Sequence, residues 1–201
     1  MKILGLSGSL RLGSYNTALL RAAGELMPDD VELEIWTGLK SVPPYDHDDD
    51  VDGAPAAVVE LRSAFAAADA VLIATPEYNA SIPGVLKNAL DWVSRPVATN
   101  PLRNKPAVVV GASTGAFGAV WAQAELRKVL STIGARTLDV EVACRHAAER
   151  FDENGRLLDD EIRAELGEAV GELVAATRAR GGAGSRPFRG VATGAGAETP
   201  A

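Results

Sequence analysis

The chain has 201 residues, a length that fits one domain built around one core. Hydrophobic residues make up 47% of it and charged residues 23%, as in ordinary folded proteins, which excludes a disordered or fibrous chain. The net charge of −7 disfavours nucleic acid and anionic lipid as partners, and no apolar run approaches the roughly 18–20 residues that cross a bilayer.

Short apolar runs rich in β-branched residues alternate with stretches of helical periodicity, a pattern typical of strand–helix–strand units around a parallel sheet. Strands are predicted at residues 2–7, 31–36, 70–75, 107–112 and 136–142. Helices between them are predicted from apolar positions three and four residues apart. In chain order these positions are Leu19, Ala23, Leu26 and Met27; Val58, Leu61 and Phe65; Ile82, Val85, Leu86, Ala89, Leu90 and Val93; and Leu126, Val129, Leu130 and Ile133.

A last helix is predicted after Asp159, whose side chain can cap its first turn. Its inward face would carry Ile162, Leu166, Ala169, Val170, Leu173 and Val174. The last 21 residues contain six glycines and five alanines, so we expect one domain over residues 1–180 and a mobile Gly/Ala-rich tail over residues 181–201.

Five strands in this alternation predict an α/β fold in three layers, a doubly wound parallel sheet of the flavodoxin-like order 2-1-3-4-5. In such folds ligands bind at the carboxyl ends of the strands, near the point where the strand order reverses. The loops after the first, third and fourth strands are therefore the candidate functional site.

The loop after the first strand, residues 8–16, is rich in glycine and serine and leads into a helix. Free N–H groups at a helix start, serine hydroxyls and the charge of Arg11 favour a bound phosphate group. The spacing resembles a Walker A loop, but Ser14 and Tyr15 stand where Lys and Ser/Thr are needed, which disfavours nucleoside triphosphate hydrolysis. The dinucleotide motif GxGxxG and the hydrolase motif GxSxG are not matched either. The alternative is a turn that only joins strand to helix.

The loop after the third strand, residues 75–84, contains two prolines and a glycine that restrict its backbone. A rigid loop that offers amide groups and the side chain of Tyr78 can grip a flat ring rich in heteroatoms. A purely structural interpretation makes Ser81 the N-cap of the next helix, with Pro83 in its first turn.

In these two loops the sequence resembles the NAD(P)H-dependent FMN reductases, a family that includes bacterial quinone and chromate reductases. Residues 8–16 resemble the family's FMN-phosphate loop, and residues 76–92 resemble its flavin-ring motif. The resemblance covers about residues 2–178 and implies a flavodoxin-like fold, bound FMN and two-electron transfer from NADPH or NADH. It implies phosphate contacts from Ser9, Arg11, Ser14, Asn16 and Thr17, and ring contacts from Pro76, Glu77, Tyr78, Asn79 and Ser81.

A third loop, residues 113–118, follows the fourth strand, and in the family it faces the pyrimidine side of the flavin. This adds Ser113 and Gly115 to the expected cofactor contacts. The chain departs from the family at Ala119, where members often have a second glycine, and at Trp121, where they often have a smaller or polar residue. We expect this departure to affect substrate preference more than flavin binding, because a tryptophan near a helix start either lines the pocket or packs in a subunit contact.

The sequence thus predicts an FMN-dependent oxidoreductase that passes electrons from NAD(P)H to quinones, free flavin or similar small acceptors by a ping-pong mechanism. No catalytic acid or base is required, because the chemistry belongs to the cofactor. The alternatives are a flavodoxin-type electron carrier, without direct nicotinamide oxidation, and a regulatory protein that keeps flavin as a structural ligand. The resemblance also implies a homodimer or homotetramer, with Leu90, Trp92 and Val93 as candidate contacts.

The remaining polar clusters are predicted to be structural. We expect the acidic run at residues 46–50 to be a solvated loop near the pocket mouth and not a metal site. Cys144 and His146 are not expected to form a catalytic pair, since no CxxC motif accompanies them. A single cysteine and a start without the pattern of a secretory signal point to the reducing cytoplasm.

Overall fold

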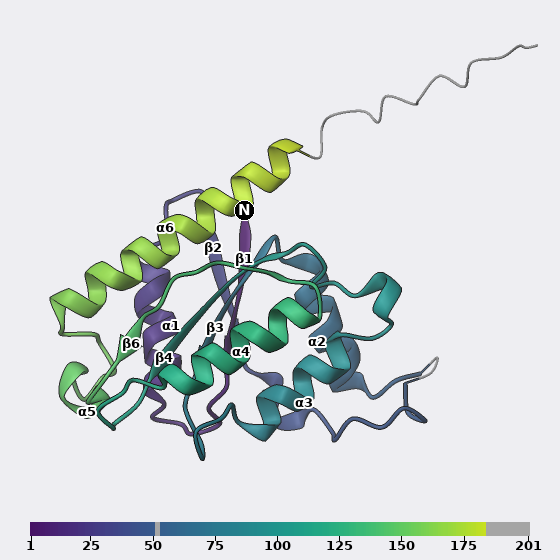
Figure 1. The fold of residues 1–201 in the computed structure, drawn as a ribbon, viewed down its shortest axis with the longest axis horizontal. Helices are drawn as coiled ribbons and strands as arrows, with labels where there is room; N and C mark the ends of the chain where they lie inside the picture. Colours follow the sequence, from purple (N-terminus) through teal and green to yellow (C-terminus); the bar gives the residue numbers. More distant parts are fainter. Residues whose placement is uncertain (51–52, 184–201) are drawn as a thin grey trace, which may run out of the picture.

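The computed structural model describes residues 1–50 and 53–183 (Figure 1). Within these residues one parallel sheet contains β1 (Lys2–Ser7), β2 (Glu32–Trp36), β3 (Ala70–Thr75), β4 (Pro106–Ala112), β5 (Arg136–Thr137) and β6 (Ala143–Cys144). The helices are α1 (Tyr15–Glu25), α2 (Ala56–Ala67), α3 (Gly84–Val93), α4 (Val120–Thr132), α5 (Ala147–Arg150) and α6 (Asp160–Ala183), with 3-10 turns η1 (Gly38–Ser41) and η2 (Val97–Thr99). The strand order is β2-β1-β3-β4-β5, which confirms the predicted doubly wound topology.

Two apolar cores, one on each face of the sheet, make the three layers of the fold. Successive residues of β3 alternate between them, so that Leu72 packs with α1 and α6 while Val71 and Ile73 pack with α2, α3 and α4. Figure 1 shows the two helix layers on either side of the sheet. Strands β3 and β4 are buried along their whole lengths, as their unbroken apolar sequences predict.

The predicted helices are present, but some of the apolar positions that predicted them lie just beyond the helix ends. Leu26 and Met27 follow α1, Ile82 precedes α3, and Ile133 follows α4. In α2 the buried positions Val58, Leu61 and Phe65 agree with the prediction. Apolar spacing thus locates the buried face of a helix better than it locates the helix ends, which depend on the backbone conformation of the flanking residues.

The prediction of one continuous strand at residues 136–142 is wrong. The chain pairs with β4 only at its two ends, where Thr137 lies opposite Ala107 and Ala143 lies opposite Gly111. Between these points β4 advances four residues and the outer segment advances six. Leu138 and Val142 still bond Ala107 and Gly111 of β4 through their backbones. The two surplus residues force residues 139–141 out of the ladder, although the alternating apolar pattern of residues 138–142 suits a strand.

Helix α6 begins as predicted and buries the predicted face. The N–H of Ile162 donates to Asp159 Oδ1 at 2.9 Å, and Arg150 donates to the other carboxylate oxygen of Asp159. The helix continues to Ala183, so the first three residues of the predicted tail are helical. The rest of that tail, from residue 184 onward, lies outside the described residues.

We expect Asp159→Ala to lower the free energy of unfolding by about 1–2 kcal/mol, because it removes the cap of α6. Asp159→Asn keeps the capping oxygen and loses only the charge, so it should cost less. The hydrogen bond from Ile162 and the charge of Arg150 hold the pKa of Asp159 below its ordinary value. Its contribution is therefore present at neutral pH and is lost as the pH falls through the folded-state pKa. Urea unfolding at pH 7 and pH 3 measures both effects, and equal losses in the two variants would contradict the capping role.

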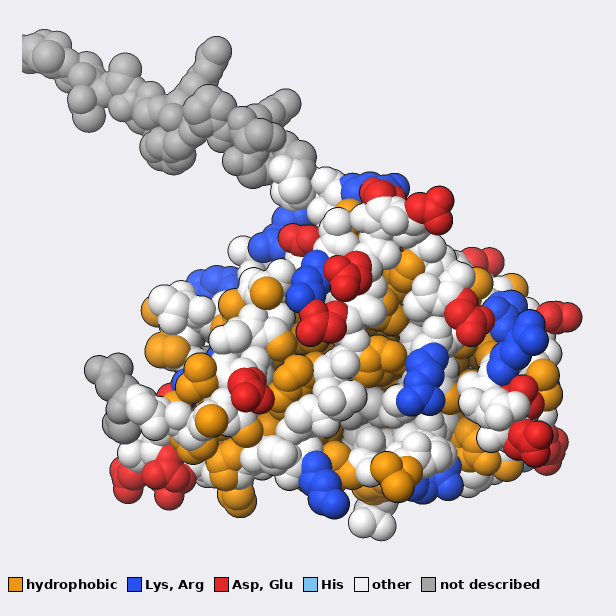
Figure 2. All heavy atoms as spheres, turned by 180° about the vertical axis from the view of Figure 1, so that it is seen from behind, with side chains coloured by type: hydrophobic (Ala, Val, Ile, Leu, Met, Phe, Trp, Pro, Cys, Tyr) orange, Lys and Arg blue, Asp and Glu red, His pale blue; other side chains and the backbone are white. Residues whose placement is uncertain are grey.

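The surface mixes charges of both signs. Figure 2 shows acidic and basic side chains side by side on one face, with hydrophobic side chains between them. Within the described residues, no helix is long and apolar enough to cross a membrane.

Candidate functional site

A cavity of about 280 Å³ opens where the strands β1, β3 and β4 end, the edge at which this topology binds ligands. All three predicted loops contribute to its wall. The lining residues are Ser9, Arg11, Ser14, Tyr15, Asn16, Pro76, Glu77, Tyr78, Ala112, Ser113 and Thr114. Among the residues predicted to contact a cofactor, Thr17, Asn79, Ser81 and Gly115 do not line it.

The first loop presents the start of α1 to the cavity. Ser14 is the N-cap, and its Oγ accepts the N–H of Thr17 at 3.2 Å. The N–H groups of Tyr15 and Asn16 open the helix, so no carbonyl one turn earlier can accept them. The guanidinium of Arg11 lies 5.0 Å above the centre of the Tyr15 ring, which keeps its charge beside the same helix end. Free amides, hydroxyls and a cation together form an anion site.

Thr17 and Asn16 support this loop through their side chains. The hydroxyl of Thr17 donates to Ser7 Oγ at 3.0 Å, and Ser7 Oγ accepts the N–H of Ser9 at 3.3 Å. The buried amide of Asn16 bonds both backbone groups of Ala112, with both distances 2.9 Å. Asn16 therefore ties the first loop to the end of β4, and its side-chain amide is engaged there, so that only its backbone N–H is available to a ligand.

The second loop turns back on itself in a tight hairpin. Tyr78 and Ser81 exchange two backbone hydrogen bonds of 3.0 and 3.1 Å, and both Asn79 and Ala80 have left-handed backbones, with φ of 53° and 59°. This is the arrangement of a type I′ turn. Asn79 is consequently exposed at the tip of the hairpin.

The prediction that Ser81 caps α3 is wrong. The helix begins at Gly84, and the N-cap position is occupied by Pro83, which makes no side-chain capping bond. Because the hairpin uses the backbone of Ser81, the helix can start only after it.

Glu77 joins the second loop to the third. Its Oε2 accepts the N–H groups of Trp121 at 3.1 Å and Ala122 at 3.2 Å, in the first turn of α4. That turn has no acidic residue of its own, so the carboxylate of Glu77 compensates the positive end of the helix dipole. The predicted ring-contacting residue is thus also the clamp between two walls of the cavity.

The third loop is held by the segment that follows β6. The N–H of Ser113 donates to Cys144 O at 3.0 Å, and the N–H groups of His146 and Ala147 donate to Gly115 O and Ser113 O at 3.1 and 3.0 Å. The N–H of Gly115 donates to Ser113 Oγ at 3.0 Å, which turns this glycine away from the cavity.

Three lining residues were not predicted. Tyr15 follows the cap of α1 and lies four residues after Arg11, and Ala112 and Thr114 flank the predicted Ser113. Their places at a strand end or a helix start could have predicted all three, because backbone groups at these places line a cavity whatever the side chain.

The later part of the predicted flavin-ring motif binds the loop that contains Pro43 and Tyr45. Asn88 Nδ2 and Trp92 Nε1 donate to Pro43 O at 2.8 and 2.9 Å, and Asn88 Oδ1 accepts the N–H of Tyr45 at 2.7 Å. Leu90, Trp92 and Val93 are buried in the core. Their prediction as subunit contacts is therefore wrong, because helical spacing does not distinguish a core face from an interface.

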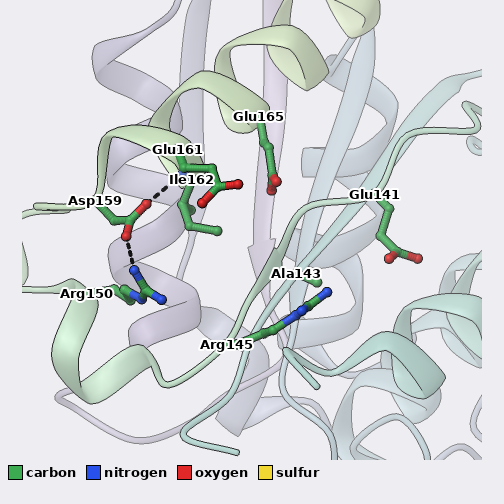
Figure 3. A pocket seen from close by; sticks show the side chains of 8 residues that line it. All are labelled: Glu141, Ala143, Arg145, Arg150, Asp159, Glu161, Ile162 and Glu165. Atoms are coloured by element: carbon green, nitrogen blue, oxygen red, sulfur yellow. Dashed lines mark hydrogen bonds and ion pairs between the residues drawn. The ribbon is translucent and has the colours of Figure 1, made fainter. Parts of the chain in front are cut away.

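A second cavity, of about 210 Å³, lies beside α6 and shares no residue with the first (Figure 3). Glu161 and Glu165 point toward it from α6, and Arg145 stands on another wall. Burial, together with the nearby charge of Glu161, raises the pKa of Glu165. Charges of both signs line this cavity, so its chemistry selects no ligand class. Among residues 1–50 and 53–183, no group of three His, Cys, Asp or Glu is arranged to hold a metal ion.

The thiol of Cys144 should be unreactive in the folded protein. It is buried, and burial raises its pKa to about 11, so the thiol is protonated at pH 8. We expect iodoacetamide to leave the folded protein unmodified at pH 8 and to alkylate Cys144 readily in guanidinium chloride. Mass spectrometry of both samples measures this, and rapid alkylation of the folded protein would contradict it.

The part of the chain that contains all three loops is similar to a known protein family. A family model described as NADPH-dependent FMN reductase matches residues 1–149. An NAD(P)H-dependent FMN reductase of Pseudomonas aeruginosa is 47% identical over 164 residues, which cover 81% of this chain and 88% of that protein. A 2-hydroxy-1,4-benzoquinone reductase of a Burkholderia species is 36% identical over 181 residues, covering 90% and 98%. Among solved structures, the flavoenzyme NAD(P)H:(acceptor) oxidoreductase FerB of Paracoccus denitrificans superimposes with a TM-score of 0.80 at 33% identity, covering 89% and 97%.

Proposed function

The chain belongs to the NADPH-dependent FMN reductase family, and from this membership we propose that it passes electrons to a quinone, a free flavin or a similar small acceptor by a ping-pong mechanism. As a member of the family it is an oxidoreductase that uses FMN, with NAD(P)H as the electron donor. The observation that carries the proposal is the single cavity formed by the three loops.

The residues of this cavity fit FMN. An anion site at the start of α1 suits the phosphate: we assign it to Arg11, to the hydroxyls of Ser9 and Ser14, and to the first N–H groups of the helix. The ring would lie between the second and third loops, in contact with residues 76–78 and 113–114. When bound, FMN supplies the two-electron chemistry, and the protein positions its ring and excludes other reactants.

The shape of the site supports the proposed ping-pong order. Three loops bound the cavity, and the clamps at Asn16 and Glu77 hold them together, so only the open side admits a second flat molecule. The oxidised nicotinamide must then leave before the acceptor enters. Among the residues that line the cavity, Glu77 carries the one carboxylate and none carries an imidazole. Glu77 is engaged in capping α4, which agrees with an exchange that requires no catalytic acid or base.

Initial rates with NADH or NADPH, varied against quinones, free flavin, chromate and azo dyes, test the proposal in the FMN-loaded protein. We expect direct oxidation of the nicotinamide and parallel double-reciprocal lines. Negligible nicotinamide oxidation would favour an electron carrier, and intersecting lines would reject the ping-pong order while leaving the cofactor assignment intact.

We also propose a homo-oligomer, dimer or tetramer, in which the contact lies outside the buried residues of α3. Light scattering measures the molar mass, and a value equal to one chain would reject the proposal. The free, buried thiol of Cys144 supports a reducing cytoplasmic location, which cell fractionation would test.

A further inference from the structure

Three aromatic residues in or next to the loops around the candidate cavity have about half of their surfaces exposed. Tyr78 is 52%, Phe117 is 59% and Trp121 is 49% exposed. Tyr78 lines the cavity, and the neighbouring Glu77 holds the backbone of Trp121 through its carboxylate. Large apolar side chains that gather at the edge of a binding site mark a surface that a ligand covers. We call Tyr78, Phe117 and Trp121 the aromatic rim.

The backbone fixes two members of the rim against each other. Gly118 and Ala119 both have left-handed backbones, with φ of 60° and 64°, and they reverse the chain between Phe117 and Trp121. The two rings consequently meet with their centres 4.8 Å apart and their planes tilted by 59°. The hydrogen bond from the Trp121 N–H to Glu77 keeps the start of α4 next to the second loop. The two rings are thus in contact with each other before a ligand arrives and together present one apolar wall.

We propose that Phe117 and Trp121 are specificity-determining residues that contact the electron acceptor and favour flat, uncharged, fused-ring quinones over single-ring or anionic acceptors. This inference rests on the proposed function. Aromatic rings stack on one another in offset or tilted arrangements, and a fused ring offers more surface to such a wall than a single ring does. In the overall reaction NAD(P)H gives a hydride and solvent gives a proton, so that the quinone becomes a hydroquinone and NAD(P)H becomes NAD(P)⁺.

The positions of Phe117 and Trp121 distinguish their proposed role from that of the cofactor site. Neither Phe117 nor Trp121 lines the cavity assigned to FMN. Truncating either side chain leaves the backbone bond to Glu77 in place, since that bond uses the N–H of Trp121. The variants Trp121→Ala and Phe117→Ala should therefore affect the acceptor without loosening the cofactor.

Steady-state kinetics of the FMN-loaded protein with menadione, 1,4-benzoquinone and ferricyanide test this selectivity. We expect each alanine variant to raise KM about 10-fold for menadione and about 2-fold for benzoquinone, with no change for ferricyanide. Trp121→Phe should recover most of the affinity for menadione. The matched control is Leu158→Ala, which removes an equally exposed apolar side chain next to the cap of α6 and should change nothing.

Two measurements that do not depend on turnover complete the test. Equilibrium dialysis of 1-naphthol, a fused ring that does not act as an electron acceptor, should show about 10-fold weaker binding to both alanine variants, while FMN titration and light scattering should match the wild type. Equal losses for all three acceptors, or an altered molar mass that accounts for the loss, would overturn the inference. If wild type fails to oxidise NAD(P)H, the proposed function fails, and the dialysis still decides whether the rim binds fused rings.

Discussion

Arg11→Ala is expected to weaken FMN binding by roughly ten- to 150-fold and to leave riboflavin binding almost unchanged. Hydrogen bonds to charged groups are typically worth about 1.5–3 kcal/mol, and riboflavin lacks the phosphate that would receive this one. The guanidinium stands at the open start of α1, held over the ring of Tyr15, so its charge adds to that of the helix end. The contrast between the two flavins isolates the phosphate contact.

Fluorescence titration of both flavins into wild type and variant measures the effect. Arg21→Ala is the matched control, because Arg21 is an exposed arginine of α1 that does not line the cavity. A shallower salt dependence of FMN binding in Arg11→Ala would support the electrostatic account. Equal losses for both flavins would mean that the substitution disturbed the ring site, and no loss would place Arg11 outside the phosphate site.

Gly118→Ala should lower the free energy of unfolding by about 2–5 kcal/mol. Its φ of 60° is a left-handed conformation, which costs a residue with a Cβ about 1–2 kcal/mol. The new Cβ would also lie 2.6 Å from the carbonyl carbon of Ala143, which is backbone and cannot rotate away. Such overpacking typically costs a further 1–3 kcal/mol. The third loop and β6 would have to separate.

Gly115→Ala, in the same loop, provides the comparison. Its added Cβ would meet only Ser113 Oγ, at 3.4 Å, and its backbone is not left-handed. We expect a change of about 1 kcal/mol or less. Urea unfolding of the two variants measures the difference, and equal stabilities would show that the loop relaxes freely around residue 118.

The sequence predicts the fold well where one strand or helix carries its own signal. Residues 70–75 and 107–112 are apolar throughout, and a strand covered on both faces requires nothing more. The interruption at residues 139–141 could not be predicted, because it depends on the number of residues that separate two pairing points on β4. The two pairing points, and the number of residues between them, are defined only in the folded sheet.

In the candidate site, too, features with a local sequence signal are predictable and contacts between distant residues are not. Local sequence alone predicts an anion site, because Ser14 and Arg11 stand just before a helix that follows a strand. The bonds of Glu77 to α4 and of Asn16 to β4 join residues 44 and 96 positions apart, and no spacing rule reaches that far. Motif resemblance predicts both residues as cofactor contacts, and both line the cavity, but the structure supplies their partners.

The interruption between β5 and β6 also affects how readily the sheet edge could pair with the sheet of another chain. An open sheet edge is a template on which another chain can add a strand, and natural proteins guard it with short strands, charges or bulges. Here one edge offers only the two-residue strands β5 and β6, offset from each other by the bulged segment, and the other edge, β2, carries Glu32 and Glu34 on its exposed positions. Neither edge suits sheet-to-sheet aggregation. Helices and loops are therefore the surfaces left for contacts between copies of this chain, and a concentrated solution should resist conversion into cross-β fibrils.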